Sequence, residues 1–224
     1  AAFEKRLIGV YQSSPTPVAR QFAAKQLRLI GTDASVPVLS TLLANPVTAD
    51  DGRYALERIA TPAAATALRE ALTSPVEGTE IGIVNSLGEL RNAESVLLIA
   101  PYIKSTNPLL RSAAAAALGK IGGDDAEKAL ITSLTTAAPG EEAPYLEAIL
   151  TAVETRVASG NVARATEIYE LLAAPANSTR AQACGLQGHA RTCPAKSRSA
   201  SLRAFAAIDA DSQRGALLKL RYVL

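Results

Sequence analysis

An apolar pattern recurs about every 30 residues in this chain, and that period leaves few folds open. Four anchor positions, spaced by 29, 31 and 31 residues, carry isoleucine or leucine. A leucine stands three residues before each anchor and an apolar residue nine after it, which gives the sets Leu27, Ile30, Leu39; Leu56, Ile59, Leu68; Leu87, Leu90, Ile99; and Leu118, Ile121, Leu130. A helical hairpin of this length cannot bury its faces alone, so such repeats stack into an α-solenoid.

The hairpin is plainest in residues 111–134. Alanines and Leu118 fall at helical spacing there. Gly122 and Gly123 are expected to end this first helix, because glycine accepts the left-handed backbone that a helix end needs. The aspartates that follow can cap a second helix, which carries Leu130.

Three Thr-Pro or Asn-Pro pairs mark helix starts independently of the apolar register: Thr16-Pro17, Thr61-Pro62 and Asn107-Pro108. We therefore predict an all-α protein, a solenoid of about six antiparallel hairpins in one domain over 1–224. The expected repeats are 16–45, 48–73, 77–105, 107–137, 142–173 and 178–208, with terminal helices at 2–12 and 211–223. Pro101 is expected to kink or end the second helix of the third repeat.

Two segments, ARQFAAKQLRLIGTDASVPVLSTLL and RSAAAAALGKIGGDDAEKALITSL, resemble HEAT-like repeats of the short kind first noted in phycobilisome lyases. They share an early arginine (Arg20, Arg111), an alanine pair, a leucine, an Ile-Gly step, an aspartate and an apolar second helix. The second and third repeats depart from this pattern, since Ala60 and Arg91 replace the glycine. The resemblance implies a binding scaffold whose second helices line a concave face.

Composition is compatible with this fold. The hydrophobic share is 48%, much of it alanine, and aromatic residues make up only 4%, so helices can approach closely. The sequence contains no run of 18 apolar residues, so we predict no membrane-spanning helix. The chain begins Ala-Ala-Phe, which fits a processed exported protein or a fragment; export is slightly favoured over the cytoplasm.

We expect no enzyme, no metal and no cofactor. The chain has one histidine, His189, and lacks H-E-x-x-H, G-x-S-x-G and phosphate-loop motifs. His189 is expected in an exposed turn. The acidic pairs Asp50-Asp51, Asp124-Asp125 and Glu141-Glu142 stand at helix starts, where they complement the helix dipole rather than hold a metal.

Cys184 and Cys193 are the only cysteines. Their nine-residue spacing is no redox or zinc motif, and either a disulfide between them or two buried thiols is open.

Charge is uneven along the chain. Residues 178–224 hold eight basic and two acidic residues, whereas the remainder holds 15 basic and 19 acidic residues. The basic residues of this end are Arg180, Arg191, Lys196, Arg198, Arg203, Arg214, Lys219 and Arg221. A solvated basic face, an acidic protein partner and nucleic acid remain open, in that order of preference.

The expected function is a non-catalytic protein-interaction scaffold. Its alternative is a lyase-like or DNA-glycosylase-like protein that binds an anionic ligand in a cofactor pocket or at the basic end. Helical phase places Ser40, Thr41, Arg69, Glu70, Lys104, Lys128 and Thr132 on the solvent side of second helices. The candidate partner-binding residues are Arg69, Lys104, Lys128, Arg180, Arg191, Lys196, Arg198 and Arg203. The segment SVLLIAPYI is expected to be deeply buried; the alternative is a docking ridge of Leu97, Leu98 and Tyr102.

Overall fold

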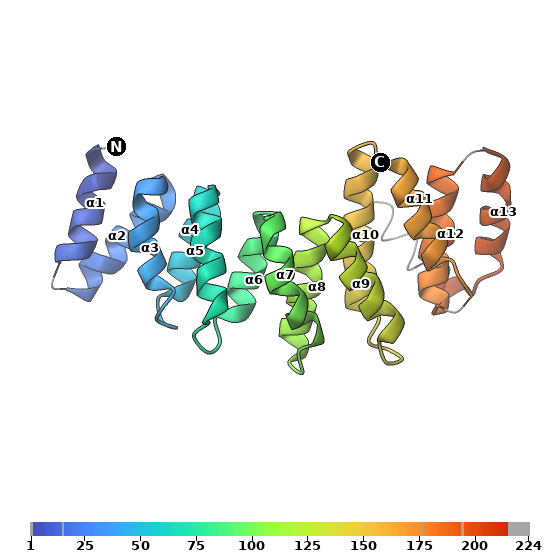
Figure 1. The fold of residues 1–224 in the computed structure, drawn as a ribbon, viewed down its shortest axis with the longest axis horizontal. Coiled ribbons are helices and arrows are strands. Elements are labelled where there is room, and N and C mark those ends of the chain that lie inside the picture. Colours follow the sequence, from blue (N-terminus) through green and yellow to red (C-terminus); the bar gives the residue numbers. More distant parts are fainter. Residues whose placement is uncertain (1, 15, 176, 194, 215–224) are drawn as a thin grey trace. The chain divides into compact units, whose positions relative to one another are not determined.

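The computed structural model describes residues 2–14, 16–175, 177–193 and 195–214, and every regular element among them is helical (Figure 1). The all-α prediction is confirmed. Two compact units divide the chain. The first holds the residues up to 148 apart from 135–137, and the second holds 135–137 and the residues from 149 onward.

The helices follow the predicted repeats closely. In chain order they are α1 (Ala2–Ser13), α2 (Pro17–Ile30), η1 (Asp33–Ser35), α3 (Val36–Leu42), α4 (Ala49–Ile59), α5 (Pro62–Thr73), α6 (Glu80–Glu89), η2 (Ala93–Ser95), α7 (Val96–Ile99), η3 (Ala100–Lys104), α8 (Pro108–Ile121), α9 (Asp124–Thr136), α10 (Ala143–Ala158), α11 (Val162–Leu172), α12 (Thr179–Thr192) and α13 (Ala195–Ala206). The labels η mark 3₁₀ helices. The helix predicted for 211–223 lies mostly outside the described residues.

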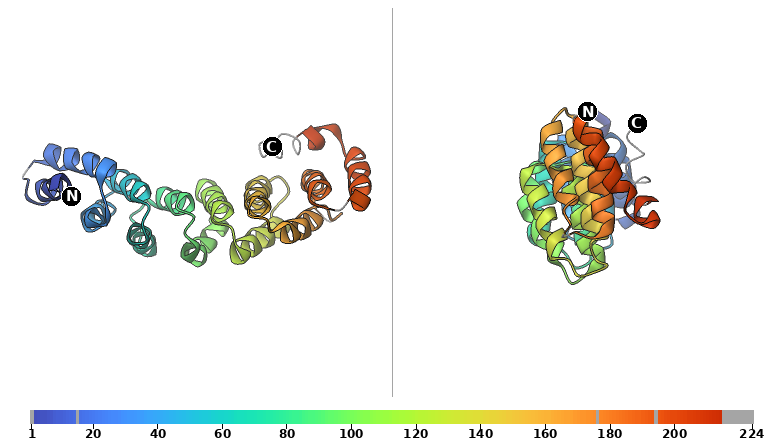
Figure 2. Two further views of the ribbon diagram at one scale, coloured as in Figure 1. Left: turned by 90° about the horizontal axis from the view of Figure 1, so that it is seen from above. Right: turned by 90° about the vertical axis from the view of Figure 1, so that its right-hand side faces the viewer.

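Unit one has two layers, visible as two rows of helices in Figure 2. The first helices of the repeats pack in order, α2 on α4, α4 on α6 and α6 on α8. The second helices do the same, α3 on α5 and α5 on α7. Helix α1 packs against α2 and α3, as the second helix of a repeat would.

The core of unit one is built from the predicted register, with one difference. The leucines before the anchors and the apolar residues after them are all fully buried: Leu27, Leu39, Leu56, Leu68, Leu87, Ile99, Leu118 and Leu130. The anchors themselves are only partly covered, and Ile30 is 44% exposed. Each anchor stands in the last turn of its helix or just beyond it, where fewer neighbours surround it.

Helix starts behave as the capping residues predict. The Thr16 and Thr61 hydroxyls accept hydrogen bonds from the amides of Ala19 and Ala64. The Asn107 side chain accepts from the amide of Leu109 at 3.0 Å. These bonds satisfy amide groups that have no partner inside the helix.

The ends of α8, α4 and α6 have a residue with positive φ, and only α8 has a glycine there. Gly122 has φ of 68°, as predicted. Ala60 and Arg91 stand at the equivalent ends of α4 and α6, and they also have positive φ, 55° and 48°. Their side chains make this left-handed backbone costly, by about 1 kcal/mol each.

The second helix of the third repeat changes type at Pro101, as predicted. Helix α7 ends at Ile99 and continues as η3, because proline lacks an amide proton and clashes with the preceding turn. The expectation of deep burial for this helix is wrong at Leu97, which is 79% exposed.

First helices approach closely where small residues meet. A Cβ added to Gly88 of α6 would lie 2.7 Å from the Cα of Ala117 on α8. This contact explains the use of small side chains in stacked hairpins.

Unit two is a smaller stack. Helix α11 packs on α12, and α12 packs on α13. Tyr169 of α11 is the largest fully buried side chain in the described structure. Among the described residues, no helix is long and apolar enough to cross a membrane.

Candidate functional site

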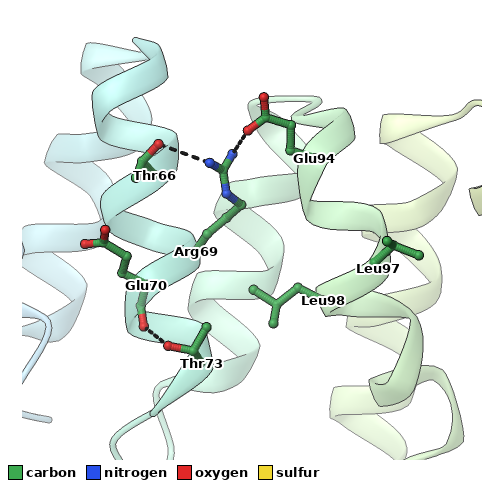
Figure 3. Close-up of a pocket in the computed structure, with 7 residues that line it drawn as sticks. All are labelled: Thr66, Arg69, Glu70, Thr73, Glu94, Leu97 and Leu98. Carbon is green, nitrogen blue, oxygen red and sulfur yellow. Dashed lines mark hydrogen bonds and ion pairs between the residues drawn. The ribbon is translucent and has the colours of Figure 1, made fainter.

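A groove of about 540 Å³ lies between α5 and α7 in unit one (Figure 3). Its lining residues come from α5, η2 and α7: Thr66, Arg69, Glu70, Thr73, Glu94, Leu97 and Leu98. The groove therefore runs between the second helices of the second and third repeats. Two of the lining residues, Arg69 and Glu70, belong to the surface that helical phase predicted.

Arg69 is held in place inside this groove. Its Nη1 donates to Asn92 Oδ1 at 2.9 Å and forms an ion pair with Glu94 Oε2 at 2.6 Å. Its Nη2 donates to Thr66 Oγ1 at 3.1 Å. The guanidinium charge is thus balanced within the protein, and Arg69 ties α5 to the segment before α7.

The apolar part of the groove comes from the third repeat. Leu97 is 79% exposed, and Leu98 is half-buried. Figure 3 shows Leu98 pointing from α7 toward α5, whereas Leu97 points from the other side of the α7 turn in this view. Leu97 is exposed because α7 is a single turn, whose buried residues are Val96 and Ile99.

Tyr102, the third residue of the predicted ridge, is half-buried like Leu98. Its hydroxyl lies 3.5 Å from the carbonyl oxygen of Leu72 on α5. Burial raises the pKa of Tyr102, and the charge of Glu80 raises it further. Tyr102 therefore supports the packing of η3 on α5, and of the predicted ridge only Leu97 and Leu98 line the groove.

The rim of the groove is acidic. The Glu94 side chain is 74% exposed although it pairs with Arg69. Glu70 is also exposed. The Thr73 hydroxyl donates a hydrogen bond to the backbone carbonyl oxygen of Glu70. The groove therefore has two carboxylates, Glu70 and Glu94, and one guanidinium, Arg69, which leaves one negative charge unbalanced.

The other second-helix candidates do not gather at this groove. Lys104, at the end of η3, and Lys128, in α9, are exposed. The hydroxyls of Ser40, Thr41 and Thr132 donate to carbonyl oxygens of their own helices.

The basic end is partly neutralised in unit two. Arg191 Nη1 lies 2.9 Å from Glu154 Oε1, and Arg214 lies 3.8 Å from Asp211. Arg180 of α12 and Arg198 and Arg203 of α13 are exposed. The side chain of Lys196, as well as Lys219 and Arg221, lies outside the described residues.

Glu154 also binds the buried Tyr169. The Tyr169 hydroxyl donates to Glu154 Oε1 at 2.8 Å. Burial raises the pKa of Tyr169 strongly, and the negative charge of Glu154 adds to that rise. Arg191, Glu154 and Tyr169 together join α10, α11 and α12.

The expectation of an exposed turn around His189 is wrong. His189 lies within α12, and its side chain is only 14% exposed. Its Nδ1 lies 2.8 Å from Ser201 Oγ on α13, and its Nε2 lies 3.0 Å from Glu170 Oε1 on α11. Ser201 is 8% exposed, whereas the Glu170 side chain is 62% exposed, so only the Ser201 end of this Ser-His-Glu line is buried.

The disulfide between Cys184 and Cys193 is not formed, and both residues are buried. Cys184 lies inside α12 and Cys193 caps its end. Nine residues of helix separate them by about 13 Å along the axis, at 1.5 Å per residue. A disulfide needs Cα atoms within about 7 Å.

The acidic pairs occupy helix starts, as expected: Asp50 and Asp51 lie in the first turn of α4, and Asp124 and Asp125 in that of α9. In the described part of the chain, no three His, Cys, Asp or Glu residues are grouped as metal ligands would be.

Comparison with known proteins finds a family match over part of the chain. A family model described as HEAT repeats matches residues 77–149. No curated protein matches the chain.

Three solved structures match the chain at low similarity. A complex of CpcE and CpcF of phycocyanin lyase from Nostoc is 17% identical, with a TM-score of 0.45 over 100% of this chain and 83% of that chain. Two engineered proteins are 18% and 20% identical, with TM-scores of 0.42 and 0.45. They cover 95% and 98% of this chain, and 97% and 68% of their own. Similarity at this level supports no statement about function.

Proposed function

Since residues 77–149 are HEAT repeats, we propose that this chain is a non-catalytic scaffold that binds a partner polypeptide in the groove between α5 and α7. Helical repeat proteins bind partners along extended surfaces formed by adjacent repeats. The observation that carries the proposal is the 79% exposure of Leu97 beside a groove whose polar residues are already held in position.

The proposed occupant is an extended segment with an aliphatic side chain next to a basic one. The aliphatic side chain would cover Leu97 and Leu98, since removal of apolar area from water is the main favourable contribution to association. The basic side chain would meet Glu70 and Glu94, because Arg69 already balances one of these two charges.

Preorganisation favours binding at this groove. Arg69 is bonded to Thr66, Asn92 and Glu94, so its side chain has little freedom left to lose. An ordered lining lowers the entropic cost of association. An acidic partner, one of the alternatives that the sequence left open, is disfavoured at this groove, since the Arg69 charge is balanced by Glu94.

A displayed library of random peptides, selected against the whole chain, tests this function. We expect enriched peptides to carry an aliphatic residue beside lysine or arginine. Their affinity should fall about tenfold or more for Leu97→Glu, because a single well-packed apolar contact contributes at least that much. Leu109→Ser is the matched control, since Leu109 is 70% exposed on α8, away from the groove.

Three outcomes would refute the proposal. Enriched peptides could be acidic, they could bind Leu97→Glu as tightly as the wild type, or they could lose equal affinity for Leu109→Ser. Circular dichroism of each variant checks that its helices are retained.

A further inference from the structure

A second cavity, of about 470 Å³, lies in the first repeat of unit one. Residues of α1, α2, α3, the segment that joins α3 to α4, and the first turn of α4 line it. It shares no lining residue with the groove between α5 and α7. Its volume is within the range of about 300–1,000 Å³ that is typical of small-molecule sites.

The wall of this cavity is largely aliphatic. Ala24 and Leu42 are only 2% and 4% exposed, so they belong to its inner side, whereas Val18 and Val47 are 77% and 87% exposed. A ligand that covers these two valines removes apolar area from water, which is the main favourable contribution to association. The ligand should therefore have an aliphatic body.

Four polar side chains of the lining already have partners close by. The Thr41 and Thr48 hydroxyls donate to backbone carbonyl oxygens at 2.7 and 2.9 Å. Asn45 Oδ1 accepts a hydrogen bond from the amide of Val47 at 2.9 Å, and the Tyr11 hydroxyl lies 3.5 Å from Thr41 Oγ1. These contacts order the lining before a ligand arrives, which lowers the entropic cost of binding.

Two charged side chains line the cavity, and both are unpaired. They are Arg20 of α2, which is exposed, and Asp51 of α4, which is half-buried. Among the described residues, neither the Arg20 guanidinium nor the Asp51 carboxylate has a hydrogen bond or an ion pair with another side chain. The cavity therefore presents one free positive and one free negative group.

The fourth repeat shows why Arg20 lacks a carboxylate partner. Arg111 stands at the equivalent position, and its Nη2 lies 3.2 Å from Oε1 of Glu141, 30 residues later. The residue 30 positions after Arg20 is Asp50, whose Oδ1 lies 2.8 Å from Nη2 of Arg53 instead. The internal partner that Arg111 has is thus taken from Arg20, and its guanidinium is available to an external anion.

We propose that this cavity binds a small zwitterion with an aliphatic body, the chemistry of an α-amino acid such as leucine. The ligand carboxylate pairs with Arg20, whose planar guanidinium can donate two parallel hydrogen bonds to it. The ligand ammonium pairs with Asp51, and the aliphatic side chain covers Val18 and Val47. A ligand with a carboxylate alone would bring it near the unpaired Asp51, which is unfavourable.

Binding of four ligands to the ¹⁵N-labelled full chain, followed by NMR, tests the proposal. Leucine carries both charges, leucine amide lacks the carboxylate, and N-acetyl-leucine lacks the ammonium group. Alanyl-leucine carries both charges at the two ends of a dipeptide. The tighter of leucine and alanyl-leucine identifies whether the zwitterion is a free amino acid or a short peptide.

We expect the zwitterions to shift resonances of residues 17–24 and 41–51. Leucine amide and N-acetyl-leucine should each bind about tenfold more weakly than leucine, because each loses one charge-assisted contact. Arg20→Gln should weaken leucine binding about tenfold without weakening the binding of leucine amide. Asp51→Asn should weaken leucine binding by a similar factor without weakening the binding of N-acetyl-leucine.

Two matched controls remove the same charges outside the cavity. Lys25→Gln removes an exposed positive charge from α2, and Asp125→Asn removes an exposed carboxylate from the first turn of α9. Neither should change the affinity for leucine. Because the Arg20 guanidinium has no internal partner, Arg20→Gln should keep the wild-type melting temperature.

The proposal fails if neither zwitterion shifts resonances around the cavity at millimolar concentration. It also fails if leucine amide or N-acetyl-leucine binds as tightly as leucine, or if a control variant loses as much affinity as Arg20→Gln. A clearly lower melting temperature of Arg20→Gln would show that the guanidinium is paired inside the protein, and would likewise overturn the proposal.

Discussion

Gly188 is a position where adding one methyl group should be costly. It lies on α12 opposite the Tyr169 ring of α11, and a Cβ there would lie less than 3.0 Å from three ring carbons. The nearest ring carbon would lie 2.1 Å from the added Cβ, whereas carbon atoms normally rest about 3.5–4.0 Å apart, so the ring would have to retreat by about 1.4 Å or more. The ring has no space for this, because Tyr169 is 1% exposed and its hydroxyl is bonded to Glu154.

The magnitude for Gly188→Ala follows from three contributions. Overpacking of a full core costs about 1–3 kcal/mol. Weakening of the hydrogen bond between Tyr169 and the Glu154 carboxylate adds up to about 1.5–3 kcal/mol. Alanine is a better helix former than glycine by about 1 kcal/mol, which offsets part of the loss. We expect a net loss of about 2–3 kcal/mol in the free energy of unfolding.

Urea denaturation followed by circular dichroism measures this loss, and hydrogen exchange locates it in α11 and α12. Gly9→Ala is the matched control, because Gly9 lies inside α1 with nothing within 4 Å of the added Cβ. That variant should gain about 1 kcal/mol of stability. The reasoning is refuted if Gly188→Ala unfolds at the same urea concentration as the wild type or above it.

Three further predictions concern helix ends and one buried carboxylate. Ala60→Gly should raise the free energy of unfolding by about 1 kcal/mol in urea denaturation, since Ala60 has φ of 55°; an unchanged midpoint would contradict this. Gly122→Val should lower it by about 1 kcal/mol or more, since Gly122 has φ of 68°, and a melt that coincides with the wild type would disprove it. Hydrogen bonds from the Ser35 hydroxyl and the Thr32 amide hold the pKa of Glu4 below its usual value. The stabilisation by Glu4 is therefore fully present above its unfolded-state pKa and is lost as the pH falls through the folded-state pKa. The wild type should have a higher free energy of unfolding than Glu4→Gln at pH 7, and this difference should disappear in acid.

Helix positions were predictable because their signals are local. Thr16, Thr61 and Asn107 cap helices through bonds to amides two or three residues away. The leucine register is likewise read within single helices, because a helix face is set by spacing alone. Capping and periodicity act over a turn or two, so they do not depend on how distant segments pack.

Surface roles depended on neighbours far along the chain. Arg69 was predicted as a solvent-facing residue that binds a partner, but Glu94, 25 positions later, balances its charge. His189 was placed in a turn because glycine and alanine flank it, whereas its side chain is bound by Ser201 and Glu170 on other helices. No local signal identifies such partners, since the rotation of packed helices decides which side chains meet.

The exposure of apolar side chains also depended on the packing of neighbouring helices. SVLLIAPYI is apolar on every side, yet Leu97 points outward because Pro101 shortens α7 and its buried positions are taken by Val96 and Ile99. Phe22 of α2 is likewise an aromatic residue of a packed helix, yet it is 57% exposed. The sequence alone determined the repeat and its helices, because those follow from short-range backbone preferences. The open surfaces were decided by the tertiary structure, because burial is a property of neighbours that the local sequence does not encode.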